Sequence, residues 1–290
     1  MIGCLPAFQS NQLIQITGDL AFSEVENFNI FGGLALAGIT GIVVIGGLKR
    51  IAEVATFLVP LMGSIYFGAM LIALILNLDQ VFPAFKLILV DAFNGTAIAG
   101  GTFFGVLIYG VRRGAFSNEA GMGTESLVHG VAKVSDPVKQ GLVAMTGPIF
   151  DTLIICTATA LMILISGVWE TSASQGVTLT AEAFSMLLGN FGGFILFICV
   201  ICFGLSTIFT YSYYGASCTR FLFGKFGMKF YIYLYIFSIF IYSIVPIDVA
   251  INIADGAFAM MAIPTLVSAL WLAPKVMQAS KNYFKLIDNY

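Results

Sequence analysis

The sequence predicts an all-α membrane protein that crosses the bilayer several times. Of its 290 residues, 59% are apolar and only 10% are charged, and the apolar residues gather in long runs. Soluble domains carry about 25% charged residues. The 13 Lys and Arg and the 15 Asp and Glu are too few to cover a soluble globule of 31.1 kDa. A transmembrane helix needs roughly 20 mostly apolar residues, and this chain offers several such runs.

Composition also excludes several classes of protein. A net charge of −2 and an isoelectric point of about 5.3 argue against nucleic-acid binding, and the high apolar content argues against disorder. The five cysteines are an odd number, and Cys156, Cys199 and Cys202 lie inside apolar runs, so no disulfide framework is expected. Walker, H-E-x-x-H and G-x-S-x-G motifs are absent from the sequence, and His129 is its only histidine. We therefore expect no enzyme, no cofactor and no metal cluster.

Seven segments are long and apolar enough to span a membrane, and we expect them to form one transport domain over residues 1–290. In order, they are Phe28–Leu48, Val54–Leu76, Thr96–Val111, Gly141–Val168, Met186–Tyr211, Lys229–Ala250 and Asn252–Leu272. The resulting division of the chain is 1–27, 28–76 with two spans, 96–272 with five spans and a loop over 112–140, and a tail over 273–290. The amphipathic stretch Val81–Val90 is expected to lie at the membrane interface or to re-enter the membrane.

The basic residues predict the orientation of these segments. With seven alternating spans, twelve of the thirteen Lys and Arg fall in loops on one side of the membrane, and only Lys86 falls on the other. Loops rich in Lys and Arg face the cytoplasm. We therefore predict a multi-pass protein of the cell membrane, held in the lipid bilayer, with a cytoplasmic C-terminus and a cytoplasmic loop over 112–140.

The N-terminal segment Met1–Ile16 is partly apolar but too short to span, and it lacks the basic start of a signal peptide. Two interpretations are open: a surface helix, or the end of a transmembrane helix that an outside loop follows up to residue 27. Gln9, Asn11 and Gln12 would be costly on a lipid-facing helix. The same side chains would be well placed on a helix that lines a cavity.

The third predicted span is interrupted near its middle by Ala99-Gly100-Gly101-Thr102. Small residues at this position allow close packing of helices. They also allow a discontinuous helix whose backbone N–H and C=O groups bind a carboxylate or a cation. Exposed backbone of this kind occurs at membrane depth only where it lines a cavity. Both interpretations are compatible with the sequence.

The fifth predicted span carries hydroxyl groups on one face. Thr207, Tyr211 and Tyr214 recur at helical spacing, with Ser206 and Thr210 beside them. Ser and Thr hydroxyls in a helix can bond to the carbonyl one turn earlier. They can also serve as the oxygen ligands that hard cations such as Na⁺ prefer.

Asp151 is the one carboxylate deep inside a predicted span. An ionised carboxylate in hydrocarbon is costly, so Asp151 should face the protein interior and have a partner. That partner is either a backbone donor in a structural hydrogen bond or a coupling ion.

The cytoplasmic loop begins with the unusual sequence RGAFSNEAGMG at Arg113–Gly123. Arg113 can anchor the membrane edge, and Ser117 or Asn118 can cap a following helix. The density of Gly, Asn and Glu suggests a specific turn whose charged side chains, Glu119 among them, pair as part of a gate.

This stretch resembles the signature region of the alanine/glycine:cation symporter family, also called the sodium:alanine symporters. Further stretches resemble the family in the same order: Gly46–Val54, Leu58–Met62, Gln140–Gly147, Asp151–Gly167, Phe203–Gly215 and Met260–Leu266. The resemblance covers essentially the whole of this chain, which we take to correspond to the C-terminal part of a family protein.

The resemblance implies a leucine-transporter-like core of inverted repeats, in which the seven spans are core helices four to ten. Met1–Ile16 then ends the third core helix, and Gly100-Gly101-Thr102 lies in the broken sixth. The implied substrate-binding residues are Gln9, Asn11, Gly100, Gly101, Thr102, Thr207 and Tyr211, and the implied cation-binding residues are Ser206 and Thr207. The residues expected to form a gating or structural motif are Arg113, Asn118, Glu119 and Asp151.

The expected function is cation-coupled symport of a small amino acid such as alanine or glycine, with Na⁺ as the coupling ion and H⁺ as the second choice. Substrate and cation would bind near the midplane, and rocking of one bundle against another would alternate access. The first helices of the family's core have no counterpart here, so we expect an N-terminal truncation. The alternative is a transport-inactive truncated or split-gene fragment, for which a missing N-terminal half would be a partner.

Overall fold

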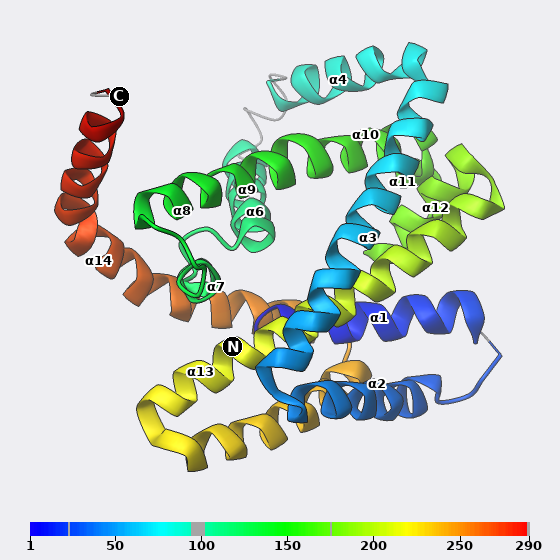
Figure 1. The fold of residues 1–290 in the computed structure, drawn as a ribbon. Helices are drawn as coiled ribbons and strands as arrows, with labels where there is room; N and C mark the ends of the chain where they lie inside the picture. The colour runs from blue at the N-terminus through cyan, green and yellow to red at the C-terminus, as the bar shows by residue number, and fades with distance from the viewer. Residues whose placement is uncertain (23, 94–101, 175, 289–290) are drawn as a thin grey trace. The chain divides into compact units, whose positions relative to one another are not determined.

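The computed structural model describes residues 1–22, 24–93, 102–174 and 176–288, and the regular elements within these ranges are all helices (Figure 1). These helices belong to two compact units. The first unit comprises Met1–Ala92 and Ala158–Asp255, and the second comprises Phe93–Thr157 and Gly256–Tyr290.

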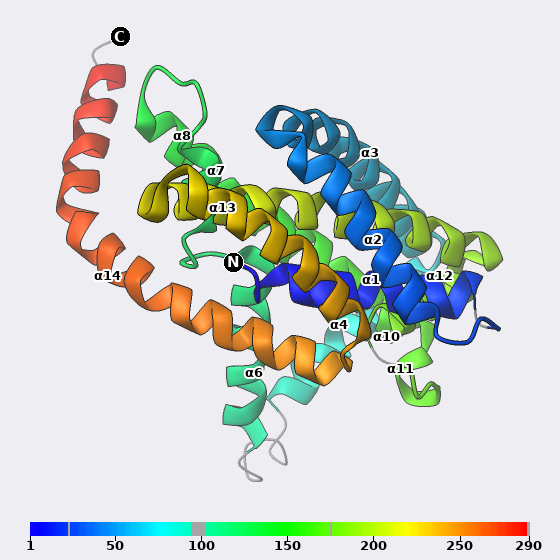
Figure 2. The same cartoon turned by 90° about the horizontal axis from the view of Figure 1, so that it is seen from below.

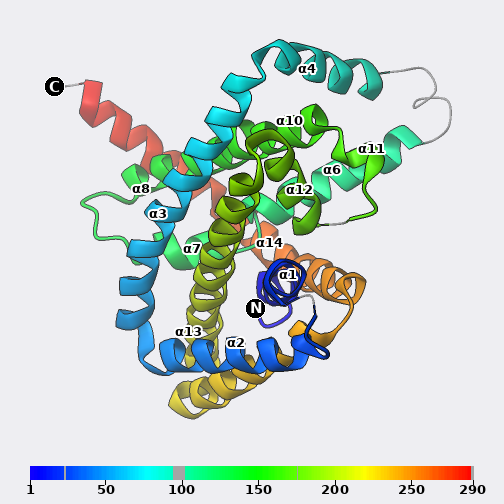
Figure 3. The same ribbon diagram turned by 90° about the vertical axis from the view of Figure 1, so that its right-hand side faces the viewer.

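The helices of the first unit include the longest helix of the described chain. In order, they are α1 Leu5–Ala21, α2 Phe28–Ile45, α3 Gly47–Leu76, α4 Leu78–Ala92, α10 Thr157–Ser166, α11 Val168–Thr171, α12 Val177–Leu188, α13 Asn190–Ile244 and the start of α14, Ile247–Asp288. α1, α2, α3 and α12 all pack against α13. Figures 2 and 3 show α1 enclosed between α2 and α13.

α13 bends sharply at Gly224, where φ is 69° and ψ is −162°, a conformation that essentially only glycine adopts. A straight helix of its 55 residues would be roughly 80 Å long, far more than the ~30 Å hydrocarbon core of a bilayer. The bend divides α13 into a first arm, residues 190–223, and a second arm, residues 225–244. The two arms run antiparallel, because Tyr231 lies beside Gly215 and the Tyr235 hydroxyl donates to the Ile208 carbonyl at 2.6 Å.

Close backbone approach holds the bundle of the first unit together. A Cβ atom at Gly204 of α13 would lie 2.6 Å from the Leu13 side chain of α1, and one at Gly33 of α2 would lie 2.8 Å from the Ser243 side chain. Small residues at such crossings let helices pack tightly. The largest fully buried side chains of this unit are Tyr211, Tyr235, Phe184, Phe209, Ile16, Met70, Met162, Ile208 and Ile239.

Within the described residues, five helices are long and apolar enough to cross a membrane. They cover Phe28–Ile45, Glu53–Leu76, Pro137–Ser166, Phe191–Ile244 and Ile247–Leu286. The two arms of α13 correspond to the fifth and sixth predicted spans, so these helices overlap six of the seven. The third predicted span, Thr96–Val111, starts among residues that are not described, and its described part lies in α6, Thr102–Asn118.

The structure corrects the sequence prediction in two places. The sequence predicts a break between the last two spans after Ala250, whereas the helix break lies at Val245 and Pro246. Proline has no backbone N–H and a fixed φ, so it separates the two helices. α12 has no counterpart among the predicted spans, because its 12 residues are too few to cross a bilayer. The amphipathic stretch Val81–Val90 lies within α4.

The second unit contains α6, α7 Thr124–His129, α8 Pro137–Ala144, α9 Thr146–Pro148, the π-helix η1 Ile149–Cys156, and α14 from Gly256 onward. Asp136 caps the start of α8, because its side chain accepts a hydrogen bond from the Val138 N–H at 2.8 Å. Phe116 of α6 packs edge-on against Phe258 of α14, with ring centroids 5.2 Å apart.

Candidate functional site

The polar residues of α1 are buried in the first unit and tie together the ends of other helices. Asn11 donates through Nδ2 to the carbonyl of Val245 at 2.7 Å and to that of Tyr242 at 3.3 Å. These carbonyls belong to the C-terminal end of α13, where the last turn of a helix lacks partners of its own. The Asn11 amide therefore completes the end of the second arm.

Gln12 makes a similar hydrogen bond at the start of α12. Its Oε1 accepts from the N–H of Val177, the first residue of that helix, at 3.0 Å, and its Nε2 donates to Gln15 at 2.8 Å. The sequence analysis predicts Gln12 only as a cavity-lining residue and misses this contact, because the start of α12 lies far along the chain. Gln9 is half-buried and makes no side-chain hydrogen bond to any described residue.

The hydroxyls of the first arm of α13 differ in what they bond. Ser206 is buried; its Oγ donates to the Phe203 carbonyl at 3.0 Å and lies 3.9 Å from Sδ of Met62 in α3. Thr210 donates to the Ser206 carbonyl at 2.8 Å. Thr207, between them, is half-buried, and within the described part of the chain its hydroxyl has no hydrogen-bond partner.

The residues around Thr207 are closely packed and include aromatic side chains. Three residues before it, Gly204 is covered by Leu13 of α1, and the carbonyl of the next residue, Ile208, accepts from the buried Tyr235 hydroxyl at 2.6 Å. One turn further on, Tyr211 is only 1% exposed and packs against Tyr214, with ring centroids 5.3 Å apart. Sequence reasoning missed Tyr235, because nothing in the local pattern shows that the two arms lie side by side.

The predicted site residues of the first unit lie on α1 and α13, two helices that pack together. Ser206, Thr207 and Tyr211 lie on the first arm of α13, which α1 contacts directly through Leu13. Gly100 and Gly101 lie outside the described residues, and only the backbone of Thr102, at the start of α6, is described.

In the second unit, the RGAFSNEAGMG sequence forms the end of α6 and the turn after it. Ser117 donates to Oδ2 of Asp151 at 2.6 Å, and Thr152 donates to Oδ1 of Asn118 at 2.9 Å. Two neighbouring pairs therefore fasten the end of α6 to η1. Asp151 therefore accepts a hydrogen bond from a side chain, whereas one of its two interpretations predicts a backbone donor.

The turn after α6 requires left-handed backbone. Glu119 has a φ of 54°, and Gly121 and Gly123 have φ values of 77° and 90°. A Cβ at Gly123 would lie 2.7 Å from Oγ1 of Thr265 in α14. The next helix, α7, starts after Gly123 without a side-chain cap, so neither Ser117 nor Asn118 caps it.

Arg113 lies over two aromatic rings of α6. Its guanidinium carbon is 5.4 Å from the ring centroid of Tyr109 and 5.1 Å from that of Phe116. Such cation–π contacts fix the orientation of a cationic side chain. Within the described residues, no group of His, Cys, Asp and Glu is arranged to hold a metal ion.

Comparison with known proteins identifies the family of this chain. The model of the sodium:alanine symporter family matches residues 1–289. The chain belongs to the sodium:alanine symporter family. The match extends over nearly the whole chain and not only over a C-terminal part of it, so the polar helix α1 lies within the family match together with the RGAFSNEAGMG turn.

Several curated relatives match this chain along most of its length. The uncharacterized transporter YflA of Bacillus subtilis is 35% identical over 91% of this chain and 58% of its own length. The sodium/alanine symporter AgcS of Methanococcus maripaludis is 34% identical over 99% of this chain and 64% of its own. The probable sodium/glutamine symporter GlnT of Bacillus subtilis is 33% identical over 94% and 58%. The chain therefore spans about three fifths of the length of these family members.

Proposed function

We propose that this protein takes part in Na⁺-coupled symport of a small amino acid such as alanine or glycine across the cell membrane. The observation that carries the proposal is the Thr207 hydroxyl, which is half-buried on α13 beside Ser206 and has no hydrogen-bond partner among the described residues. Membership of the sodium:alanine symporter family supports the choice of ion and substrate class.

The chemistry of these hydroxyls suits a sodium ion. A hydroxyl oxygen keeps lone pairs for a cation even when its O–H donates elsewhere, so Ser206 can bond to the Phe203 carbonyl and still face an ion. Na⁺ is a hard cation that prefers such neutral oxygen ligands. H⁺ is the second candidate for the coupling ion. The names of two relatives, a sodium/alanine and a probable sodium/glutamine symporter, support Na⁺.

In this proposal the amino acid binds next to the ion. Tyr211, Gln9 and Asn11 contribute from α13 and α1, and Gly100, Gly101 and Thr102 contribute from a broken helix whose backbone groups bind the substrate. The helices form a leucine-transporter-like core of inverted repeats with a cytoplasmic C-terminus, and rocking of one bundle alternates access. Arg113 and Glu119 form part of a gate in this proposal, and the hydrogen bonds to Asn118 and Asp151 hold the end of α6 against η1 next to it.

Uptake into proteoliposomes tests this function. Radiolabelled alanine is offered to vesicles that contain the purified chain, with an inward gradient of either Na⁺ or choline. We expect accumulation in the Na⁺ gradient only, because ion and substrate stabilise the same occluded state. Equal accumulation in both gradients, or none in either, would contradict the proposal.

A further inference from the structure

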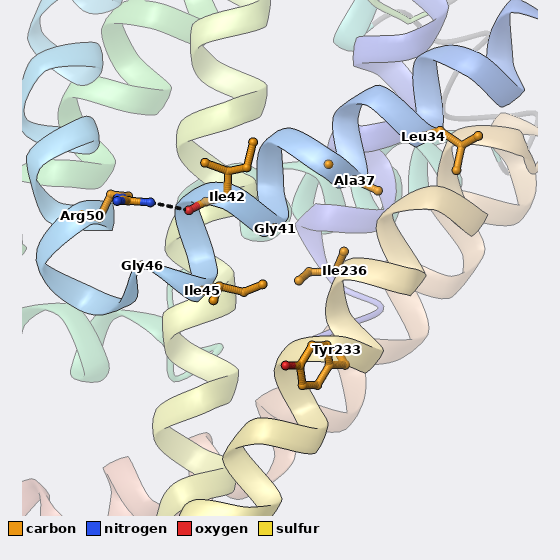
Figure 4. Close-up of a pocket in the computed structure, with 10 residues that line it drawn as sticks. Leu34, Ala37, Gly41, Ile42, Ile45, Gly46, Arg50, Tyr233 and Ile236 are labelled. Atoms are coloured by element: carbon orange, nitrogen blue, oxygen red, sulfur yellow. Dashed lines mark hydrogen bonds between the residues drawn. The ribbon is translucent and has the colours of Figure 1, made fainter.

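An apolar groove of about 740 Å³ runs between α2 and the second arm of α13 (Figure 4). Its lining residues are Leu34, Ala37, Gly38, Gly41, Ile42, Ile45, Gly46, Arg50, Tyr233 and Ile236. In Figure 4 the side chains of Ile45 and Ile236 lie in the space between the two helices. Several of these residues are strongly exposed, including Ile42 at 68% and Tyr233 at 66%. The groove therefore opens on the outer face of two helices that the sequence places in the bilayer.

The two helices that form the groove run antiparallel in a defined register. A Cβ at Gly33 would touch Ser243, and one at Gly41 would touch Ile236 at 3.6 Å. Continued along both helices, this register brings Ile45 at the C-terminal end of α2 opposite Ile232, about one helical turn from Lys229. Lys229 precedes Tyr233 by four residues and Ile236 by seven, so all three lie on one face of the second arm.

The end of the groove at the α2 C-terminus is cationic. Arg50 folds back over Gly46, where a Cβ would lie 2.7 Å from its Cδ and Nε atoms, and its Nη1 donates to the Ile42 carbonyl at 2.7 Å. A guanidinium has five N–H donors, so the other donors of Arg50 remain for an anion. Lys229 is exposed and makes no hydrogen bond to a described residue.

We infer that this groove binds an anionic glycerophospholipid. An acyl chain lies against Leu34, Gly38 and Ile45, and the headgroup phosphate lies between Arg50 and Lys229. The groove follows α2 from Leu34 to Ile45, roughly 17 Å at the rise of an α-helix, which is close to the ~15 Å depth of one leaflet. Basic residues at the cytoplasmic edge of a membrane attract anionic lipids. A neutral lipid would match the apolar wall but not the cationic end.

Lipid binding is measured by native mass spectrometry of the purified 290-residue chain in detergent. Phosphatidylglycerol and phosphatidylcholine with identical acyl chains are titrated separately. We expect phosphatidylglycerol to bind more tightly, and Arg50→Gln and Lys229→Gln each to weaken it about fivefold, the effect of one basic residue at the membrane surface. Lys133→Gln, which removes an exposed charge from a loop outside the groove, is the matched control and should change nothing.

Two variants separate the lipid site from a merely structural Arg50. Lys229→Gln removes charge without removing a hydrogen bond, so it tests the site even if Arg50→Gln unfolds the chain. Gly38→Leu fills the groove, since a Cβ at Gly38 meets nothing within 4 Å, and Gly68→Leu in α3 is its control for the same reason. We expect Gly38→Leu, and not Gly68→Leu, to abolish the tightest phosphatidylglycerol site.

Four outcomes would overturn the inference. Equal affinity for the two lipids would show that the site does not recognise an anionic headgroup. Unchanged binding in both charge variants would show that Arg50 and Lys229 do not bind the lipid. Competition by glycerol 3-phosphate, which has no acyl chain, would show that the apolar wall of the groove does not contribute to binding. Oxidation of a Gly38→Cys chain to a disulfide-linked dimer, absent from the wild type treated in the same way, would assign the groove to a second copy of this chain. The measurement does not depend on transport, so its failure leaves the proposed symport untouched.

Discussion

Three neighbouring hydroxyls on one helix differ in whether they have a hydrogen-bond partner, and this difference sets Thr207 apart. Ser206 and Thr210 donate to carbonyls of their own helix, whereas Thr207 has no partner among the described residues. Local back-bonding is the usual fate of such groups in a helix. The Thr207 hydroxyl, which has no partner among the described residues, is therefore the one whose replacement tests the ion site.

Thr207→Ala is expected to raise the Na⁺ concentration for half-maximal alanine uptake about tenfold, the factor that corresponds to the loss of roughly 1.4 kcal/mol from the site. Sodium titrations of uptake into proteoliposomes measure it. Thr210→Ala is the control, because Thr210 is not a predicted ion ligand and its hydroxyl donates to the Ser206 carbonyl at 2.8 Å. An unchanged Na⁺ dependence in Thr207→Ala would remove this residue from the ion site.

Asn11 is held by two carbonyls at the end of α13, so its replacement affects the fold before it affects a ligand. Asn11→Ala should lower the free energy of unfolding by about 1–3 kcal/mol, the cost of leaving buried polar groups unsatisfied. Chemical denaturation in detergent measures this loss. Gln9→Ala, which breaks no hydrogen bond within the described chain, should leave stability nearly unchanged; equal losses in both variants would show that Asn11 does not cap α13.

At the scale of elements, most helices follow from hydrophobicity alone. α2, α3 and the two arms of α13 match predicted spans, because apolar runs of this length have few other stable arrangements. The break at Pro246 and the short helix α12 were harder to predict from the sequence. Apolar residues lie on both sides of Pro246, and α12 is held by a hydrogen bond from Gln12 of a distant helix. The π-helix around Asp151 has no sequence pattern of its own.

The bend at Gly224 is the element on which the pairing of the two arms depends. Gly224→Ala should destabilise the chain by about 1–3 kcal/mol, because its φ of 69° and ψ of −162° suit essentially only glycine. Gly63→Ala in α3 is the control: it meets open space in a regular helix and should stabilise by up to ~1 kcal/mol. Thermal denaturation of both variants decides the matter, and a neutral Gly224→Ala would refute the strained bend.

At the scale of the whole molecule, the sequence could predict the family but only part of the site. The Arg113–Gly123 stretch pointed to the sodium:alanine symporters, and the family match over residues 1–289 confirmed it. The cation-binding role of Ser206 and Thr207 stays a prediction, and the partners of Asn11, Gln12 and Tyr235 depend on contacts between distant segments. Gly100 and Gly101 lie outside the described residues, and their binding role stays a prediction.

The central claim is that a sodium ion and a small amino acid bind to this protein in a coupled way. Isothermal titration of the purified chain with alanine, in NaCl and in choline chloride of equal ionic strength, tests it most directly. Coupled binding predicts an alanine affinity about tenfold higher in NaCl, and an equal gain in Na⁺ affinity when alanine is present, because linkage is reciprocal. An alanine affinity that is the same in the two salts would contradict the account.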